Sequence, residues 1–358
     1  SAVVGFTGPT KFLPCAGVSN EKCRVLSTIR MQAENSKDLP SQLLVPEAAL
    51  SRRRVVQLTA GSVLAATAPL PVLSKVAGQP GSFVKLSNEG GDFPLMSFGL
   101  QVYDNDKARK LTLVALEAGV RNFFSSVLAG NQRGFAQAIK ESGIPREDIY
   151  ICGSVVSNRA NGFEAAYKAT TRGWENNMKE FSAGNIDYLD QIMLDYPGRD
   201  KSSILGQWKA FQEMKAKGLT KSLSVSNFDS QQLDFVINDE ATSTKPCVNQ
   251  LPFNLAYHPG GAKPTAQWNS DRGVLVQAWA PLGASTGGFS KRIKTTCAQI
   301  GERYGKTGAQ VALRWIVDSG ASFTTSASSK QHFQDNLNIF DFALSPEDIA
   351  TLNALSAD

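Results

Sequence analysis

The sequence predicts an α/β fold, a (β/α)8 (TIM) barrel preceded by an N-terminal targeting leader. Two observations lead to this prediction. Short apolar runs alternate with amphipathic segments from residue 93 onward, and repeated strand–helix units form parallel strands joined by right-handed crossovers. Basic side chains are in excess only before residue 79, which separates a leader from the body of the chain.

The leader accounts for the whole net charge. The 358 residues contain 37 Lys and Arg against 32 Asp and Glu, a formal charge of +5. Residues 1–78 contain nine basic and four acidic side chains, which leaves 28 of each in residues 79–358. Phosphate neutralisation needs a basic surface, so the neutral body argues against a nucleic-acid partner.

Residues 1–30 resemble a plastid transit peptide. They contain four basic side chains and a single acidic one, Glu21, and they show no sustained helical or strand period. Such acid-poor composition is typical of organelle transit peptides. The stretch 28–33 resembles the end of a plastid transit peptide.

Residues 31–78 resemble a twin-arginine-type export signal followed by a linker. Three arginines at 52–54 precede an uncharged run over residues 55–74, which is broken by Pro69 and Pro71. A membrane-spanning helix needs about 20 predominantly apolar residues, so this run is a poor span. Two signals in this order resemble those of thylakoid-lumen proteins, so we expect the protein in the plastid thylakoid lumen. The alternative is a disordered tail with a chance arginine triplet.

The body, residues 79–358, contains eight predicted strands: one near 95–98, then 121–124, 149–153, 191–194, 222–225, 248–250, 274–278 and 322–325. Apolar positions recur every three or four residues in the predicted helices 107–118, 131–142, 165–181, 202–217 and 309–318. Gly143, Gly218 and Gly320 stand where helices should stop. Eight units match a closed barrel, typically about 250 residues long.

The rival architecture is a doubly wound open sheet. No G-x-G-x-x-G turn follows the first strand, which favours the barrel. A barrel places its chemistry at the C-terminal ends of the strands. The chain has only two histidines, His258 and His332, so a multi-histidine metal site is excluded. Cys152, Cys247 and Cys297 lack metal-ligand spacing and are expected to be buried thiols.

A series of short motifs runs through the body. In order they are 98–99 (FG), 119–121 (GVR), 142–148 (SGIPRED), 186–190 (IDYLD), 208–211 (WKAF), 225–228 (VSNF), 278–283 (AWAPLG) and 313–315 (LRW). Each motif alone is weak, but together and at these spacings they are specific. From residue 93 to about 355 the chain resembles the aldo-keto reductases, and the resemblance also implies a barrel.

The resemblance implies NADPH-dependent carbonyl reduction, in which a Tyr donates a proton, a Lys paired with an Asp favours the ionised Tyr, and a His orients the carbonyl. General acid–base help of this kind contributes about 10²–10⁴-fold. The family pattern G-x-R-x-x-D-x-A-x-x-Y-G-N aligns without gaps from residue 119 to 131. The Asp position is then Phe124, the Tyr position Ala129, the Lys position Ser154 and the His position Asp195.

These four replacements predict that no catalytic residue remains. Ala129 cannot donate a proton, and Ser154 carries no charge. An ionised Asp195 only accepts hydrogen bonds and would repel the oxyanion that hydride transfer creates. Losing the Lys alone would leave a buried carboxylate unpaired, whereas losing both, with Phe124 filling the space, is a coherent apolar repacking.

The resemblance also implies cofactor-binding positions. The residues concerned are Ser226, Asn227 and Gln250 for the nicotinamide amide, Trp279 for its ring, Leu282 on the pyrophosphate loop, and Asp335 and Asn336 for adenine. The expected Lys or Gly is Ser326, and the Arg that grips the 2′-phosphate is His332. Without a guanidinium, bidentate phosphate recognition is lost, so NADP or NAD is expected to bind weakly if it binds.

Each position also has a purely structural interpretation. Trp279 would cap the barrel core, the pair at 226–227 would tie down a loop, and Asp195 would pair locally. His258 is expected to be a solvent-facing loop residue. Ser125, Ser126 and Ser154 supply hydroxyls without a general base, which argues against a Ser–His hydrolase.

Three functions remain open. The first is a catalytically degenerate barrel that acts as a binding or assembly protein in the thylakoid lumen, with a thylakoid membrane complex as candidate partner. The second is an NAD(P)-dependent oxidoreductase with a non-standard acid, for instance Tyr196 or protonated Asp195. The third is a lumenal sensor that binds a dinucleotide or small ligand without turnover. The fold alone does not decide between them.

Overall fold

A computed structural model describes residues 83–357 except 88–89, 259–260 and 285. The predicted transit segment (1–30) and export signal (31–78) lie outside the described residues, so both remain predictions. Among the helices that the structure describes, none is long and apolar enough to cross a membrane.

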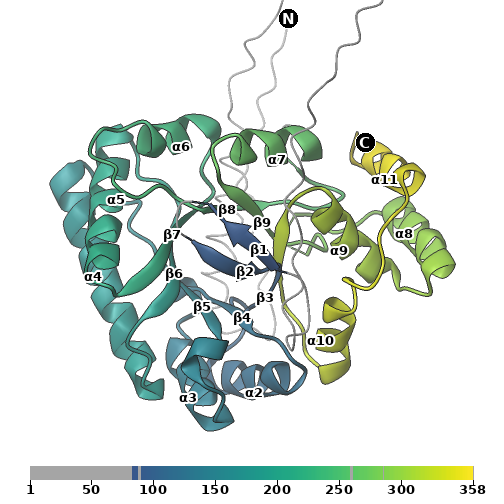
Figure 1. Cartoon of the computed structure of the whole chain (residues 1–358), viewed down its shortest axis with the longest axis horizontal. Coiled ribbons are helices and arrows are strands. Elements are labelled where there is room, and N and C mark those ends of the chain that lie inside the picture. The colour runs from purple at the N-terminus through teal and green to yellow at the C-terminus, as the bar shows by residue number, and fades with distance from the viewer. Residues whose placement is uncertain (1–82, 88–89, 259–260, 285, 358) are drawn as a thin grey trace, which may run out of the picture. The chain divides into compact units, whose positions relative to one another are not determined.

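Eight parallel strands close into a barrel in the order β10-β3-β4-β5-β6-β7-β8-β9, with helices around them (Figure 1). The strands are β3 (Met96–Gly99), β4 (Asn122–Ser125), β5 (Tyr150–Val155), β6 (Leu189–Asp195), β7 (Thr220–Ser226), β8 (Val248–Pro252), β9 (Leu275–Trp279) and β10 (Ser322–Thr325). The predicted (β/α)8 barrel is confirmed, and the open-sheet alternative is excluded because β10 pairs with both β9 and β3.

The helices that follow the strands are α2 (Asn105–Glu117), α3 (Gln132–Ser142), α4 (Phe163–Phe181), α5 (Lys201–Ala216), α6 (Ser230–Ile237), α7 (Ala262–Ser270), α8 (Lys291–Tyr304), α9 (Gly308–Asp318), α10 (Lys330–Leu337) and α11 (Pro346–Asn353). Several begin at a side-chain cap. Asp104 and Asp200 accept hydrogen bonds from the first turns of α2 and α5, and such caps satisfy otherwise unpaired N–H groups. Gly143 ends α3 in the left-handed region, as predicted.

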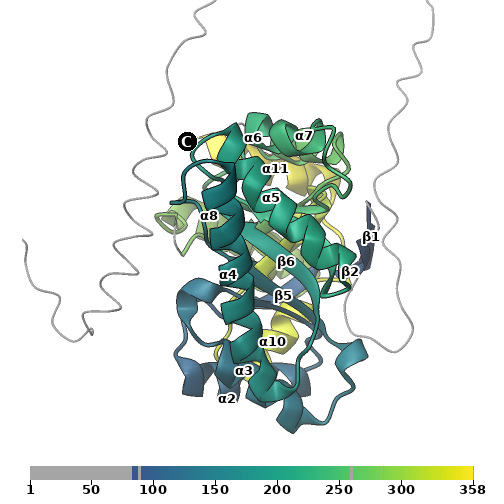
Figure 2. The same ribbon diagram turned by 90° about the vertical axis from the view of Figure 1, so that its left-hand side faces the viewer.

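A two-stranded antiparallel hairpin, β1 (Phe83–Leu86) and β2 (Gly91–Pro94), precedes the barrel and was not predicted. Figure 1 shows it in front of the strands, and Figure 2, turned by 90°, shows it at one side of them. The ring of Phe93 meets Tyr150, the first residue of β5, edge to face at 5.1 Å. The hairpin therefore closes the amino-terminal end of the barrel.

Strand alternation divides the core into two parts. Side chains such as Phe123 and Phe135, whose rings lie 5.5 Å apart, pack between strands and helices. Phe124, Cys152 and Met193 form a separate buried cluster. Because they alternate with the outward-facing residues of β4, β5 and β6, they fill the inside of the barrel.

Candidate functional site at the mouth of the barrel

The four positions that the resemblance predicts to have lost the catalytic residues come together at the carboxyl ends of three adjacent strands. Phe124 lies on β4, Ser154 on β5, and Asp195 is the last residue of β6. Ala129 ends the short 3-10 helix η1 (Val127–Ala129), which follows β4. The parallel pairing of β4 with β5 and of β5 with β6 places the four side chains around one end of the barrel.

The space between these strands is filled rather than open. Phe124, Cys152 and Met193 are 2%, 3% and 0% exposed and contact one another. Ser154 is fully buried, and its Oγ accepts a hydrogen bond of 3.1 Å from the backbone N–H of Val127. Position 154 therefore anchors the loop that carries Ala129 instead of supplying a charge.

Asp195 is the one acidic side chain among the four positions. It is 6% exposed and receives hydrogen bonds from the hydroxyl of Ser226 and, at 3.5 Å, from Nδ2 of Asn227. Burial raises the pKa of the Asp195 carboxyl to about 6, although the bond from Ser226 acts in the opposite direction. Burial also raises the pKa of the neighbouring phenol of Tyr196, and the Asp195 carboxylate adds to that effect.

A chain of amide and indole groups continues from Asp195 across the mouth. Nδ2 of Asn227 also donates to Oγ of Ser226 at 2.9 Å, and the indole Nε1 of Trp279 donates to Oδ1 of Asn227 at 3.1 Å. Gln250 is bonded through Nε2 to Oε1 of Gln277 at 2.8 Å. The structure thus brings Ser226, Asn227 and Trp279 together with Asp195 in one network.

Three strands end in residues with unusual backbone conformation. Tyr196 (φ 70°), Asn227 (φ 62°) and Ala280 (φ 49°) directly follow β6, β7 and β9. A side chain in this left-handed region costs on the order of 1–3 kcal/mol and persists only where the surroundings impose it. Such residues cluster at functional sites, which supports the barrel mouth as the site of this protein.

Known proteins resemble this chain over the same residues. A family model described as "Aldo/keto reductase family" matches residues 95–357. The chain belongs to the aldo/keto reductase family. It is 32% identical to a glyoxal reductase of Bacillus subtilis (strain 168) over 278 residues, which cover 77% of this chain and 93% of the relative. It is 27% identical to an aldo-keto reductase of Mycobacterium sp. (strain KMS) over 269 residues, 75% of this chain and 91% of the relative.

A solved structure that resembles this chain is also an aldo/keto reductase. The crystal structure of an aldo/keto reductase from Brucella melitensis aligns with a TM-score of 0.67 at 28% sequence identity, covering 76% of this chain and 98% of that one. Most of each relative's length is therefore present here, including the strands that build the mouth.

The nicotinamide cofactor of aldo/keto reductases is only partly matched by the residues present. At the nicotinamide end, Asn227, Gln250 and half-buried Trp279 offer amide groups and an aromatic ring. At the other end, Ser326 and His332 are exposed, and the carboxylate of Asp335 accepts from Gln331 at 2.8 Å. No guanidinium or ammonium occupies positions 326 or 332, so these residues do not fit NADPH gripped by its 2′-phosphate.

The remaining predicted positions have structural surroundings. Leu282 is partly buried against the core, and Asn336 is buried on α10. His258 is half-buried rather than solvent-facing: its Nδ1 lies 2.9 Å from the carbonyl oxygen of Asn254, and its ring lies 5.7 Å from that of Trp315. Loop position alone did not reveal this packing, because Trp315 comes from a distant helix. The three body cysteines are buried free thiols, as predicted.

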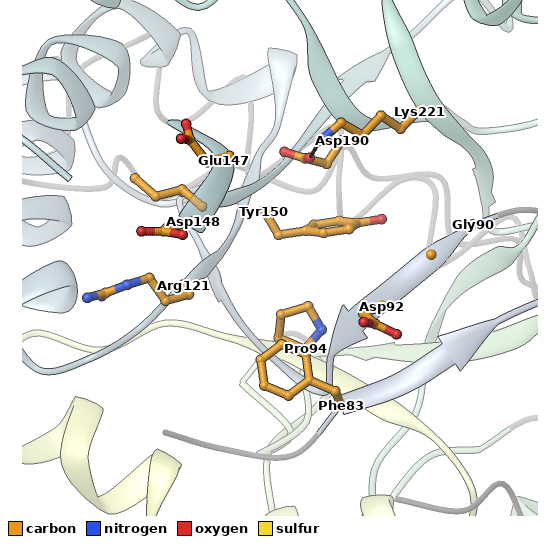
Figure 3. Close-up of a pocket in the computed structure, with 12 residues that line it drawn as sticks. Phe83, Gly90, Asp92, Pro94, Arg121, Glu147, Asp148, Tyr150, Asp190 and Lys221 are labelled. Atoms are coloured by element: carbon orange, nitrogen blue, oxygen red, sulfur yellow. Dashed lines mark hydrogen bonds and ion pairs between the residues drawn. The ribbon is translucent and has the colours of Figure 1, made fainter. Parts of the chain in front are cut away.

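Sequence reasoning missed a cavity of about 340 Å³ at the opposite end of the barrel. Figure 3 shows Asp92 and Gly90 of the hairpin on one side of it and Asp190 and Lys221 on another. The Asp190 carboxylate is fully engaged, by Lys221 at 2.9 Å, by Arg146 at 2.8 Å and by a backbone N–H. Asp190 and Lys221, which line the cavity, are bonded to each other, so this part of the cavity serves to hold strands β6 and β7 together. No signal in the sequence linked the hairpin to these strand ends.

Neither end of the barrel offers a candidate metal site among the described residues. Within the described part of the chain, no group of three or more His, Cys, Asp or Glu side chains is placed to hold a metal ion. The mouth offers one buried carboxylate, several amides and hydroxyls, an indole and an apolar floor.

Proposed function

We propose that this aldo/keto reductase barrel has lost the family's carbonyl-reducing chemistry and acts as a non-catalytic binding or assembly protein. The observation that carries the proposal is the mouth itself. Phe124, Ala129 and Ser154 supply neither a proton donor with a tuned pKa nor a cation, and Asp195 supplies a negative charge.

The charge of Asp195 acts against carbonyl reduction. Hydride transfer to a carbonyl produces an oxyanion, which enzymes stabilise with donors or cations. Two like charges 4 Å apart near a protein surface repel by about 4 kcal/mol. An unfavourable term of that size in the transition state slows a reaction by about 10³-fold. An ionised carboxylate at this position therefore opposes the step that defines the family.

The loss of the four groups is also internally consistent. An Asp left at position 124 without its Lys would be a buried unpaired charge, which costs several kcal/mol. Phe124 instead packs against Cys152 and Met193, and Ser154 holds η1 in place. This packing supports a barrel adapted to a role other than turnover.

The proposed place of action is the plastid thylakoid lumen, with a thylakoid membrane complex as partner. Support comes from the two leader segments, 1–30 and 31–78, and from the confinement of the net charge to them. The test is import of the 358-residue chain into isolated plastids, followed by protease protection and native electrophoresis of thylakoids. Replacing Arg52 and Arg53 together by lysine should block entry to the lumen, whereas Lys75→Arg should not. Lumenal delivery by the double variant would overturn the proposed route.

The catalytic part of the proposal is tested with the purified full chain. Because a relative is named a glyoxal reductase, glyoxal with NADPH or NADH is the assay of choice, and nucleotide binding is followed by Trp fluorescence. We expect no turnover above the protein-free rate. A fourfold variant, Phe124→Asp, Ala129→Tyr, Ser154→Lys and Asp195→His, is the matched comparison. Turnover by the unaltered chain would overturn the proposal.

One observation favours the second candidate, an NAD(P)-dependent oxidoreductase with a non-standard acid. The pKa of Asp195, raised to about 6 by burial, lies near that of a general acid at neutral pH. Under this alternative, the unaltered chain would oxidise NADPH with a carbonyl substrate, and Asp195→Asn would abolish the reaction. Neither effect is expected under the binding role.

A further inference from the structure

Asp195 differs from every other buried carboxylate in the part of the chain that the structure describes. Three carboxylates are buried there, Asp190, Asp195 and Asp348, each 6% exposed. Asp190 has Arg146 and Lys221 as partners, and Asp348 has Arg303 and the phenol of Tyr304. No ion pair between described residues includes Asp195, although buried charges in proteins are normally paired.

The groups that face Asp195 are neutral. Its hydrogen-bond donors are the hydroxyl of Ser226 and, at 3.5 Å, the amide of Asn227. The titratable groups that respond to its charge are the phenol of Tyr196 and the thiol of Cys152, and burial raises the pKa of both. Both groups are therefore protonated at neutral pH. None of these neighbouring groups neutralises the carboxylate, so a single positive charge beside it would be favourable.

An aromatic side chain is held close to this carboxylate. Nε1 of Trp279 donates to Oδ1 of Asn227 at 3.1 Å, and Nδ2 of the same amide faces Asp195. One amide therefore bridges the indole and the carboxylate and fixes their relative position. An indole ring that one amide links to a carboxylate offers the two contacts by which organic ammonium groups are recognised, cation–π attraction and a charge-assisted hydrogen bond.

Exposed large apolar side chains stand on the rim of the mouth, together with charged side chains such as Asp104 and Arg159. The exposed large hydrophobic side chains of the described residues are Val102 (70%), Leu128 (41%), Phe163 (38%) and Tyr257 (38%). All four lie where a strand leads into the next helix: after β3, β4, β5 and β8. That is the end of the barrel at which Asp195 lies. Small-molecule sites typically combine apolar side chains with a small number of polar groups.

We propose that the barrel mouth binds an apolar organic ammonium, with its charged nitrogen on Asp195 and its aromatic or alkyl body against Trp279 and the apolar side chains of the rim. This proposal rests on the non-catalytic binding role and names the ligand class of that same site. Position 154, where the resemblance expects a Lys, is a neutral Ser, and position 195 carries a negative charge. A site that would assist a developing anion has become one that favours a cation.

The test is calorimetric titration of the full chain at pH 8 with three probes of similar shape: 2-phenylethylammonium, 2-phenylethanol and 3-phenylpropanoate. We expect the ammonium to bind at least tenfold more tightly than the alcohol and the carboxylate not to bind. Equal affinity for the ammonium and the alcohol would overturn the proposal.

Variants separate the role of Asp195 from general charge and folding effects. Asp195→Asn should weaken binding of the ammonium at least tenfold and leave the alcohol unchanged. Asp106→Asn removes an exposed carboxylate from the first turn of α2, at the same end of the barrel, and should change neither. Circular dichroism and thermal unfolding establish that both variants are folded. Undiminished ammonium binding by folded Asp195→Asn would refute the site.

A second variant tests the aromatic contribution. Trp279→Phe keeps a ring and should retain most of the affinity, whereas Trp279→Leu should lower it by about three- to tenfold, a loss of about 1 kcal/mol as expected for a cation–π contact. Failure of ammonium binding together with absent glyoxal reduction would reject this inference and leave the proposed function intact. Glyoxal reduction by the unaltered chain would reject the proposed function itself.

Discussion

Replacing Asp195 by asparagine removes a buried negative charge while keeping the shape of the side chain. Burial raises the pKa of this carboxyl from its ordinary 3.8 to about 6. An acid whose pKa is raised on folding stabilises the native state below its unfolded pKa, and that contribution is lost as the pH rises through the folded pKa. The ionised carboxylate is therefore a cost to the native protein at pH 7 and above.

The size of this cost follows from the two pKa values. At 1.36 kcal/mol per pKa unit, the difference corresponds to about 3 kcal/mol at pH 7.5, and to well under 1 kcal/mol at pH 4. The amide N–H groups of the new Asn reduce the gain somewhat, because one of them lacks an acceptor. We expect Asp195→Asn to raise the free energy of unfolding by about 2–3 kcal/mol at pH 7.5, or the melting temperature by about 4–8 °C.

Urea unfolding at pH 4, 6 and 7.5 measures this effect, with the full chain and Asp106→Asn as references. The gain in the free energy of unfolding should grow with pH for Asp195→Asn. It should not do so for Asp106→Asn, because Asp106 is exposed. A gain independent of pH, or a loss of stability at pH 7.5, would refute the reasoning. Either result would mean that the carboxylate has a compensating partner in solution.

Three further predictions follow from the same contacts. Calorimetric titrations from pH 5 to 8 should show a constant affinity for 2-phenylethylammonium above about pH 6. Below that pH the affinity should decrease, by up to about tenfold for each pH unit, because only the ionised form of Asp195 attracts the cation. Asp190→Asn should lower the free energy of unfolding in urea by about 3 kcal/mol because two cations lose a buried partner, while Glu117→Gln, which breaks an exposed ion pair, should cost under about 1 kcal/mol. Ser154→Lys alone should destabilise the barrel by several kcal/mol because it buries an ammonium beside Phe124. Adding Phe124→Asp should recover at least about 1 kcal/mol in a double-mutant cycle of urea unfolding, and additive losses would contradict that pairing.

The strand boundaries show which parts of the strands could be predicted from hydrophobic periodicity. The strand predicted at 322–325 coincides with β10, a fully buried run that begins shortly after the helix-ending Gly320. The strand predicted at 191–194 is longer in the structure, Leu189–Asp195. The added residues include the polar Asp190 and Asp195, and the ends join the strand because Asp195 pairs in register with Ser226 and Leu189 with Thr220. Pairing between distant segments, which local sequence does not display, extends the strand.

The hairpin β1–β2 marks a different limit. Its strands, Phe83–Leu86 and Gly91–Pro94, are short and stand apart from the repeated strand–helix units that identified the other short strands. Its stability comes from contacts with β5 and its neighbours, including the edge-to-face pair of Phe93 and Tyr150. Local pattern does not identify an element whose stability depends on a surface built by the rest of the chain.

The sequence by itself determined the barrel and the family, because strand–helix alternation and ordered motifs are local properties of the chain, and it predicted four positions at which a proton relay is missing. Only the tertiary structure decided how those positions are surrounded. Phe124 became part of a filled interior because it meets Cys152 and Met193. Asp195 became a buried carboxylate without an ion pair among the described residues, and pairing of this kind depends on which distant segments the fold brings together.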